Sequence, residues 1–183
     1  MNVNFQTVSN GHHDISMPDI RELERMLPFL EKDICNKLFL KYINQNLFEH
    51  AKKVAPFASV ELINQAVSKK IEEGYKVDIL IAFMDCEIRD SMILKIYEEK
   101  DIQASSNYFP FAGKSLIKKI ALIEYKKNKL RYFEYIASFM EKELLNNMVK
   151  NTIEKHGIVA INHLVKFIDK DVLKTFVNEN YLK

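Results

Sequence analysis

The sequence contains few of the residues that form tight turns, cross-links or metal sites. Its 183 residues include 4 glycines, 4 prolines, 2 cysteines and no tryptophan. A sandwich or barrel of short strands needs many turns rich in Gly and Pro, so this composition argues against both folds. Cys35 and Cys86 are too few for a disulfide framework or a zinc motif, and we expect both thiols to be reduced. The 48% apolar content suffices for an ordinary folded core.

Long apolar runs are also absent. No stretch approaches the roughly 18 uncharged apolar residues that cross a bilayer, and residues 1–13 are polar. We therefore expect neither a membrane span nor a secretory signal. The formal net charge of +2 neither requires nor excludes an anionic partner. These features predict a cytoplasmic protein, in which residues 1–15 form a flexible N-terminal arm.

Phenylalanine recurs at a nearly constant interval. Six residues are separated by 28, 26, 28, 28 and 28 positions: Phe29, Phe57, Phe83, Phe111, Phe139 and Phe167. Proline comes directly before three of them, as Pro28, Pro56 and Pro110. Self-similarity at a fixed period of this length is the signature of tandem structural repeats.

The residues after each Phe have the spacing of an amphipathic α-helix. Apolar side chains occupy the fifth, ninth, tenth and fourteenth positions of every copy, as Ile34, Leu38, Phe39 and Ile43 do in the first. Separations of four, one and four residues place these columns on one side of a helix with 3.6 residues per turn. An acidic residue near the start of five of the six segments suits the positive end of a helix.

The expected helix ends carry residues that tolerate the left-handed backbone conformation. Seventeen positions after the Phe come Asn46, Gly74 and Asn128, and Gly157 follows one position later in its copy. Gly and Asn are the residues that most often close a helix in this conformation. We expect the turn inside each repeat at these positions.

A second, shorter helix is expected to run from each turn to the next Phe, for example over residues 47–55 and 130–137. The prolines before the Phe should stop or kink it. Residues 19–27 would form the second helix of an incomplete leading copy, and residues 171–181 a final first helix. The interval is two residues shorter over 74–83, which predicts a shorter or skewed second helix there.

A two-helix unit of this length cannot bury its apolar stripe alone, and stacking against neighbours gives the stripe a partner. We predict an all-α fold in which tandem two-helix repeats over residues 16–183 form a single domain, a right-handed α-solenoid. The sequence resembles HEAT-like α-solenoids and, through motifs such as Leu27-Pro28-Phe29, the short Pro-Phe-Leu helical repeats of uncharacterised bacterial proteins. This resemblance covers residues 26–183. It implies a fold and a habit of binding macromolecules, and it carries over no functional residue.

No catalytic, metal-binding or cofactor motif is evident. His12 and His13 could chelate a metal only weakly, because a closed site needs a third and a fourth ligand. The acidic groups at 85–87 and 98–99 suggest acid–base chemistry, but they fall at a predicted helix start and near a predicted helix end, and capping or solvation explains the first. We predict no cofactor, no metal and no enzymatic activity, with a site assembled across repeats as the alternative.

Charge is distributed unevenly along the repeats. Residues 81–108 carry three basic and six acidic side chains, whereas residues 109–136 carry seven basic and two acidic. A basic and aromatic cluster lies around the turn of the second of these copies: Lys126, Lys127, Lys129, Arg131, Tyr132 and Tyr135. Such a cluster is suited to phosphates and nucleic-acid bases. The alternatives are a solvated turn, or contact between acidic and basic copies of different molecules.

One column of the predicted first helices is polar in every copy. The seventh residues after the Phe are Asn36, Asn64, Asp90, Lys118, Asn146 and Lys174. Such a column is ordinarily the solvated face of an amphipathic helix. If the first helices line an exposed groove, the same ladder would supply hydrogen-bonding groups to a bound peptide.

These features favour a non-enzymatic interaction module that presents an extended helical groove to a protein partner or to another copy of itself. The alternative is a nucleic-acid-binding helical array that uses the basic fourth repeat. Salt separates the two hypotheses, because phosphate binding weakens steeply as salt rises and a largely apolar contact responds much less.

Overall fold

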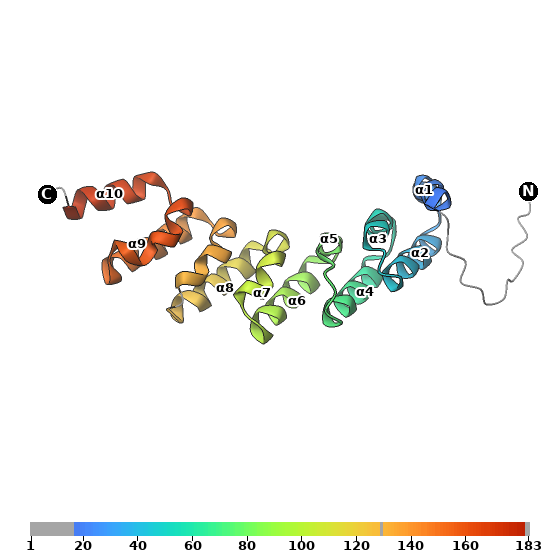
Figure 1. The fold of residues 1–183 in the computed structure, drawn as a ribbon, viewed down its shortest axis with the longest axis horizontal. Coiled ribbons are helices and arrows are strands. Elements are labelled where there is room, and N and C mark those ends of the chain that lie inside the picture. Colours follow the sequence, from blue (N-terminus) through green and yellow to red (C-terminus); the bar gives the residue numbers. More distant parts are fainter. Residues whose placement is uncertain (1–16, 129, 182–183) are drawn as a thin grey trace, which may run out of the picture. The chain divides into compact units, whose positions relative to one another are not determined.

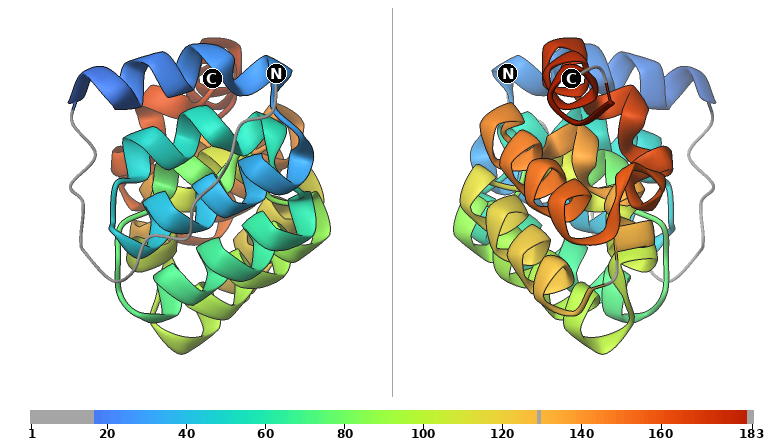
Figure 2. Two further views of the ribbon diagram at one scale, coloured as in Figure 1. Left: turned by 90° about the vertical axis from the view of Figure 1, so that its right-hand side faces the viewer. Right: turned by 90° about the vertical axis from the view of Figure 1, so that its left-hand side faces the viewer.

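The computed structural model describes residues 17–128 and 130–181, and every regular element within these ranges is helical (Figures 1 and 2). This confirms the prediction of an all-α fold. The chain divides into two compact units, with the boundary between Ser59 and Val60.

One long helix follows each repeated phenylalanine and begins three residues after it, which confirms the predicted first helices. These helices are α2 (Lys32–Asn44), α4 (Val60–Glu72), α6 (Cys86–Glu99), α8 (Lys114–Lys126), α9 (Lys142–His156) and α10 (Lys170–Tyr181). The period found in the sequence is therefore the period of the fold.

The second segment of each repeat is shorter and combines α-helix with 3₁₀-helix. The segments are α1 (Met17–Met26) with η1 (Leu27–Phe29), α3 (Phe48–Val54) with η2 (Ala55–Phe57), α5 (Asp78–Ile81), α7 (Ile102–Ser105) with η3 (Ser106–Phe111), η4 (Leu130–Tyr135) with η5 (Ala137–Phe139), and η6 (Ile158–Phe167). Pro28, Pro56 and Pro110 each lie within a 3₁₀ turn, where the α-helix has ended as expected. The predicted shortening before Phe83 is present, because α5 has only four residues.

The expectation of a second α-helix over residues 130–137 is wrong. This stretch forms the 3₁₀ segment η4 and begins a second one, η5. The sequence Leu130–Tyr135 is rich in aromatic residues, and Ile158–Phe167 is rich in β-branched ones. Both kinds of side chain lose rotamer freedom in an α-helix, so the tighter 3₁₀ form competes more easily over such short stretches.

The predicted left-handed helix ends are confirmed. Asn46 and Asn128 have φ values of 58° and 56°, and Gly74 and Gly157 have φ values of 86° and 80°. Helix α6 ends differently, at Lys100 with φ −116°. Its turn is the one that departs from the common pattern, and it borders the candidate site described below.

The most deeply buried columns lie next to the repeated phenylalanines, which are exposed in the first two copies and partly buried in the other four. Phe29 is 86% exposed and Phe57 is 36% exposed. The tenth column is fully buried in five successive copies, as Phe39, Val67, Ile93, Ala121 and Val149. The position two residues before each Phe is also buried in five copies: Leu27, Ala55, Ile81, Phe109 and Ala137. The Phe residues thus mark the repeat, and among them Phe139 and Phe167 pack against the edge of the core.

In the first unit, α2 packs against α3 and η2, and α1 continues into η1. Glu24 on α1 is held by two residues of α3, with His50 Nδ1 and Lys53 Nζ each 2.6 Å from its carboxylate oxygens. Burial alone would raise the pKa of Glu24, but hydrogen bonds from Lys53 and His50 outweigh it and lower the pKa. The ion pair therefore ties α1 to α3.

In the second unit, contacts between successive repeats involve both the first helices and the second segments. Helix α6 packs against α4 on one side and α8 on the other, and α10 packs against α9 (Figure 1). Among the second segments, α5 contacts η3, α7 contacts η4, and η4 contacts η6. A continuous cluster of buried apolar residues extends from Ile93 to Ile168.

Candidate functional site

A carboxylate lies on the buried face of α8. Ile117, Ile120, Ala121 and Glu124 follow one another at intervals of three, one and three residues, which places them on one face of the helix. All four are buried, and Glu124 is only 3% exposed. A charged carboxylate at such a position is costly unless neighbouring groups compensate it.

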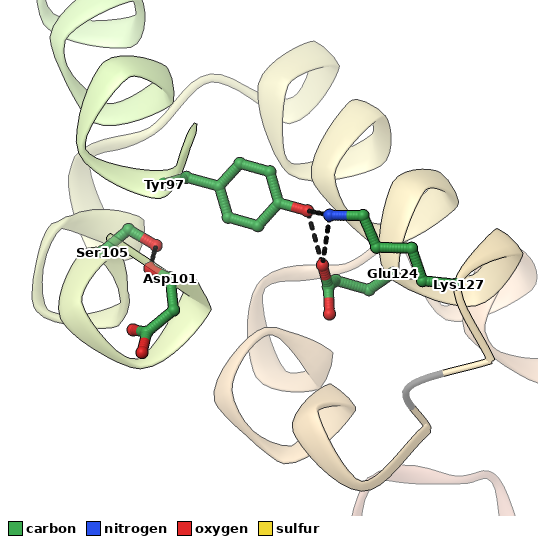
Figure 3. Close-up of polar contacts among 5 residues, drawn as sticks. All are labelled: Tyr97, Asp101, Ser105, Glu124 and Lys127. Carbon is green, nitrogen blue, oxygen red and sulfur yellow. Dashed lines mark hydrogen bonds and ion pairs between the residues drawn. The ribbon is translucent and has the colours of Figure 1, made fainter. Parts of the chain in front are cut away.

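The first compensating group is Tyr97, near the end of α6. Its side chain is buried, and its hydroxyl donates a hydrogen bond of 2.5 Å to Glu124 Oε1 (Figure 3). Burial raises the pKa of Tyr97, and the hydrogen bond to Glu124 raises it further. The phenol is therefore held in its protonated form as a hydrogen-bond donor.

The second compensating group is Lys127, the C-cap residue of α8. Its Nζ lies 3.4 Å from Glu124 Oε1 and 3.3 Å from the Tyr97 hydroxyl (Figure 3). The same ammonium lies 5.3 Å from the centre of the Tyr97 ring, within cation–π range. Its side chain is half exposed, so the positive charge reaches the carboxylate from the solvent side.

These three side chains line a polar hollow of about 500 Å³ between the third and fourth repeats, which we call the Glu124 pocket. Its walls also include Asp101, Ile123 and Tyr132. Asp101 is fixed at the start of α7, where its carboxylate accepts a hydrogen bond from the Ala104 N–H at 2.7 Å. The Ser105 hydroxyl donates to the Asp101 carbonyl at 3.0 Å (Figure 3). These bonds hold one edge of the pocket in place.

The structure separates the members of the predicted basic and aromatic cluster. Lys127 and Tyr132 line the Glu124 pocket, whereas Lys126 lies in a hollow of about 280 Å³ that also contains Lys155 and His156. Lys129 lies outside the described residues.

The remaining members of that cluster form a row of aromatic contacts. The Arg131 guanidinium lies 5.0 Å from the centre of the Tyr132 ring. Tyr132 in turn stacks on Tyr135, with 6.5 Å between ring centres and 25° between ring planes. The cluster therefore supplies a cation–aromatic row and two separate lysines.

The predicted polar ladder connects successive repeats. The Asn36 Oδ1 accepts a hydrogen bond from the Ser59 N–H at 2.8 Å, at the start of the next repeat. The same bond recurs from Asp85 N–H to Asn64 at 2.9 Å and from Gly113 N–H to Asp90 at 2.9 Å. The accepting side chain therefore holds the backbone directly before the next first helix. Such bonds satisfy polar groups that a helix start leaves unpaired.

The ladder changes in its later members. Asn146 donates to the Asp169 carboxylate at 3.0 Å, and Lys142 lies 3.3 Å from the same carboxylate, so the pKa of Asp169 is lowered by both contacts. Lys118 and Lys174 are exposed and take no such part among the described residues. A role for the ladder in binding a peptide stays a prediction, since these side chains already hold the next repeat in four copies.

Sequence reasoning missed the two central residues, Tyr97 and Glu124. Tyr97 appeared only as an apolar member of the fourteenth column. The available signal was the spacing of Glu124, which falls seven residues after Ile117 on the buried stripe of α8. An acid in the phase of a core column deserves inspection because an unpaired buried charge is so unfavourable.

Two further groups were candidates for catalysis or metal binding: the acidic residues at 85–87, and His12 with His13. Asp85 caps α6, accepting a hydrogen bond from the Glu87 N–H at 2.8 Å. Within residues 17–128 and 130–181, no cluster of three His, Cys, Asp or Glu side chains is placed to hold a metal. His12 and His13 lie outside that part of the chain. None of the helices described is long and apolar enough to cross a membrane.

Comparisons with known proteins add no further constraint. No family model matches the chain, and no curated protein or solved structure matches it either. Functional inference therefore rests on the geometry of the chain itself.

Proposed function

We propose that this chain is a non-enzymatic interaction module, whose two-helix repeats stack as a right-handed α-solenoid and bind a protein partner through a groove between α4 and α6. The stacking is supported by the contacts that each repeat of the second unit makes with the next. The handedness rests on the resemblance to HEAT-like repeats. Repeat arrays of this kind use extended surfaces for binding.

The observation that carries the proposal is an apolar hollow on the first-helix layer. It measures about 440 Å³, and Ile71, Ile88, Met92 and Ile96 contribute its apolar lining. Ile88 is 46% exposed. Exposed apolar side chains gathered in a hollow with a polar rim are typical of a protein interface.

The rim of this groove is charged and ordered. Lys95 on α6 binds Glu72 on α4 at 2.9 Å, and a hydrogen bond from the Lys95 ammonium to Glu72 raises the pKa of Lys95. Glu99 and Lys100 continue the rim. A partner that buries an apolar side chain between α4 and α6 would meet both signs of charge around it, which favours one orientation.

The test compares two substitutions at the same repeat position. Ile88→Asp places a charge in the groove, and Ile34→Asp is its matched control, because Ile34 occupies the same column of the first repeat and is 42% exposed. We expect Ile88→Asp to lower capture of a specific partner by about tenfold or more, and Ile34→Asp to leave it nearly unchanged. Native mass spectra of the same variants report self-association. The proposal is contradicted if neither partner capture nor self-association depends on Ile88.

A second candidate is a nucleic-acid-binding array, favoured by the row formed by Arg131, Tyr132 and Tyr135. Aromatic faces beside a guanidinium can stack bases and attract phosphates. The affinity for a single-stranded oligonucleotide should then fall steeply from roughly 50 to 200 mM salt.

The variants for this test lie at the two ends of α8. Replacing Lys126, Lys127, Lys129 and Arg131 by Ala should abolish oligonucleotide binding. The control replaces Lys114, Lys118 and Lys119, at the start of the same helix, and should weaken binding less. Equal affinities for the two variants would eliminate the candidate.

A further inference from the structure

The Glu124 carboxylate is buried but only partly satisfied. Its Oε1 receives both the Tyr97 hydroxyl and the Lys127 ammonium. Its Oε2 accepts no hydrogen bond from the described residues and is directed away from that pair (Figure 3). Oε2 is not one of the fully buried polar atoms that lack a partner, so it borders the open space of the pocket, where the donor of a ligand can reach it.

The group that now neutralises Glu124 fits the pocket loosely. Lys127 Nζ is 3.4 Å from Oε1, which is long for a charge-assisted hydrogen bond. Its side chain is 50% exposed, and a lysine stem can swing into solvent with little loss. Lys127 therefore shows that the pocket accepts a positive charge. Its own side chain does not fill the pocket.

The walls suit a flat cation better than a compact one. The Tyr97 ring already lies within cation–π range of the Lys127 ammonium, and Tyr132 forms another wall. The charges around the pocket are Glu98, Asp101 and Glu124 against Lys100 and Lys127, an excess of one carboxylate. A guanidinium is planar, stacks on aromatic faces and donates to both oxygens of a carboxylate at once.

We propose that the Glu124 pocket binds the guanidinium of an arginine side chain, which displaces the Lys127 ammonium and donates to both carboxylate oxygens of Glu124. This inference deepens the proposed function and rests on it, because it names the chemistry of a side chain that a partner inserts. Lys100 lines both the Glu124 pocket and the groove between α4 and α6, so one partner segment can reach both.

The probe is N-acetyl-argininamide, titrated into the full chain and followed by NMR. N-acetyl-citrullinamide is the matched control, because it has nearly the same shape and no charge. We expect saturable binding of the arginine compound only, and weaker binding of N-acetyl-lysinamide. Equal binding of the citrulline compound overturns the proposal, and equal binding of the lysine compound overturns the preference for a guanidinium.

Three variants locate the binding. Lys127→Met keeps the aliphatic stem and removes the competing charge, so affinity should rise about three- to fivefold. Glu124→Gln should weaken binding by about tenfold or more. If Glu124→Gln unfolds the chain because Glu124 is buried, Tyr132→Ala provides a second test. Tyr132 is a half-buried wall residue, and its removal tests the stacking of the guanidinium on its ring. No gain in Lys127→Met, or no loss in either of the other two, overturns the proposal.

The outcomes separate this inference from the proposed function. Partner capture that depends on Ile88 but is unchanged in Glu124→Gln and Lys127→Met would overturn the arginine site and leave the groove intact. Binding of N-acetyl-argininamide without any partner or oligomer that depends on Ile88 would leave the site intact and contradict the groove.

Discussion

At the scale of single residues, Glu124 and Tyr97 form the least expected contact of the chain. Glu124 occupies the thirteenth position after its Phe, where the preceding repeat has the buried Ile96. Helix α8 therefore places a carboxylate at a buried position. An aliphatic side chain there would need no hydrogen-bond donor, whereas the carboxylate does. The neighbouring repeat supplies that compensation through the Tyr97 hydroxyl, 2.5 Å from the carboxylate.

We predict that Tyr97→Phe lowers the free energy of unfolding by about 1–3 kcal/mol at neutral pH, because a buried carboxylate loses its donor. The pKa of Tyr97 is raised in the folded state, so above about pH 10 the unfolded chain loses this proton first. The wild-type stability should therefore fall with rising pH above about 10, and Tyr97→Phe should remove part of that fall. Denaturant unfolding at several pH values measures both effects.

The control for this prediction is Tyr108→Phe. Burial raises the pKa of Tyr108 as well, but its hydroxyl has no hydrogen bond to a carboxylate among the described residues. Tyr108→Phe should therefore cost less at neutral pH. If the two variants lose the same stability, the contact with Glu124 is not the cause.

Gly113 lies close to the carboxylate of Asp90. A Cβ atom on Gly113 would lie 2.5 Å from Asp90 Oδ2, while Asp90 Oδ1 accepts a hydrogen bond from the Gly113 N–H. We predict that Gly113→Ala displaces Asp90 and lowers the free energy of unfolding by about 1–2 kcal/mol. The same substitution in an Asp90→Ala background should cost clearly less, and thermal unfolding of the four proteins in this cycle tests the coupling.

At the scale of elements, the recurring contact is the side chain of one first helix on the start of the next. It joins α4 to the N-cap of α6, and α6 to the N-cap of α8. Only a short polar side chain reaches the backbone at that point. Lys118 stands at this position in α8 and is exposed, so the following junction is secured by other contacts.

We predict that Asn64→Ala lowers the free energy of unfolding by about 1 kcal/mol, because the Asp85 N–H loses its acceptor. Alanine favours helices, so the matched control is Gln65→Ala, an exposed neighbour on α4. The control should leave stability unchanged or raise it slightly. A loss in Asn64→Ala no larger than in the control would show that the cross-repeat bond contributes nothing. Chemical denaturation measures the difference.

Sequence reasoning located the first helices and their ends because their signals are local. The positive φ values of Asn46, Gly74, Asn128 and Gly157 follow from residue type and from the end of the apolar stripe. The second segments were harder, since residues 130–135 form a 3₁₀ segment under the influence of their packing against α8 and η6. Short aromatic stretches carry little information on which kind of helix forms.

The candidate site was not predictable to the same degree. The Glu124 pocket depends on Tyr97 and Glu124, which are 27 residues apart and meet only when the third and fourth repeats pack together. The polar ladder was recognised as a column, but its partners lie one repeat further along the chain. Periodicity reveals which face a residue occupies, and the identity of its neighbour requires the packing between repeats.

At the scale of the whole molecule, the two units are built from one repeat and the same type of junction. In the proposed solenoid, stability would approximate a sum of repeat terms and nearest-neighbour terms. We therefore predict that the losses caused by Asn36→Ala and Asn146→Ala add within about 0.5 kcal/mol in the double variant. Denaturant unfolding of the single and double variants tests this, and a larger coupling would indicate cooperation between distant repeats.

The polar ladder also has a direction. Asn36, Asn64 and Asp90 each precede the amide that they hold by 21 to 23 residues. During synthesis from the N-terminus, each of these three acceptors therefore leaves the ribosome before the helix start that it binds. At these three junctions the acceptor is synthesised before its donor, whereas the junction after α8 has Lys118 in place of the acceptor.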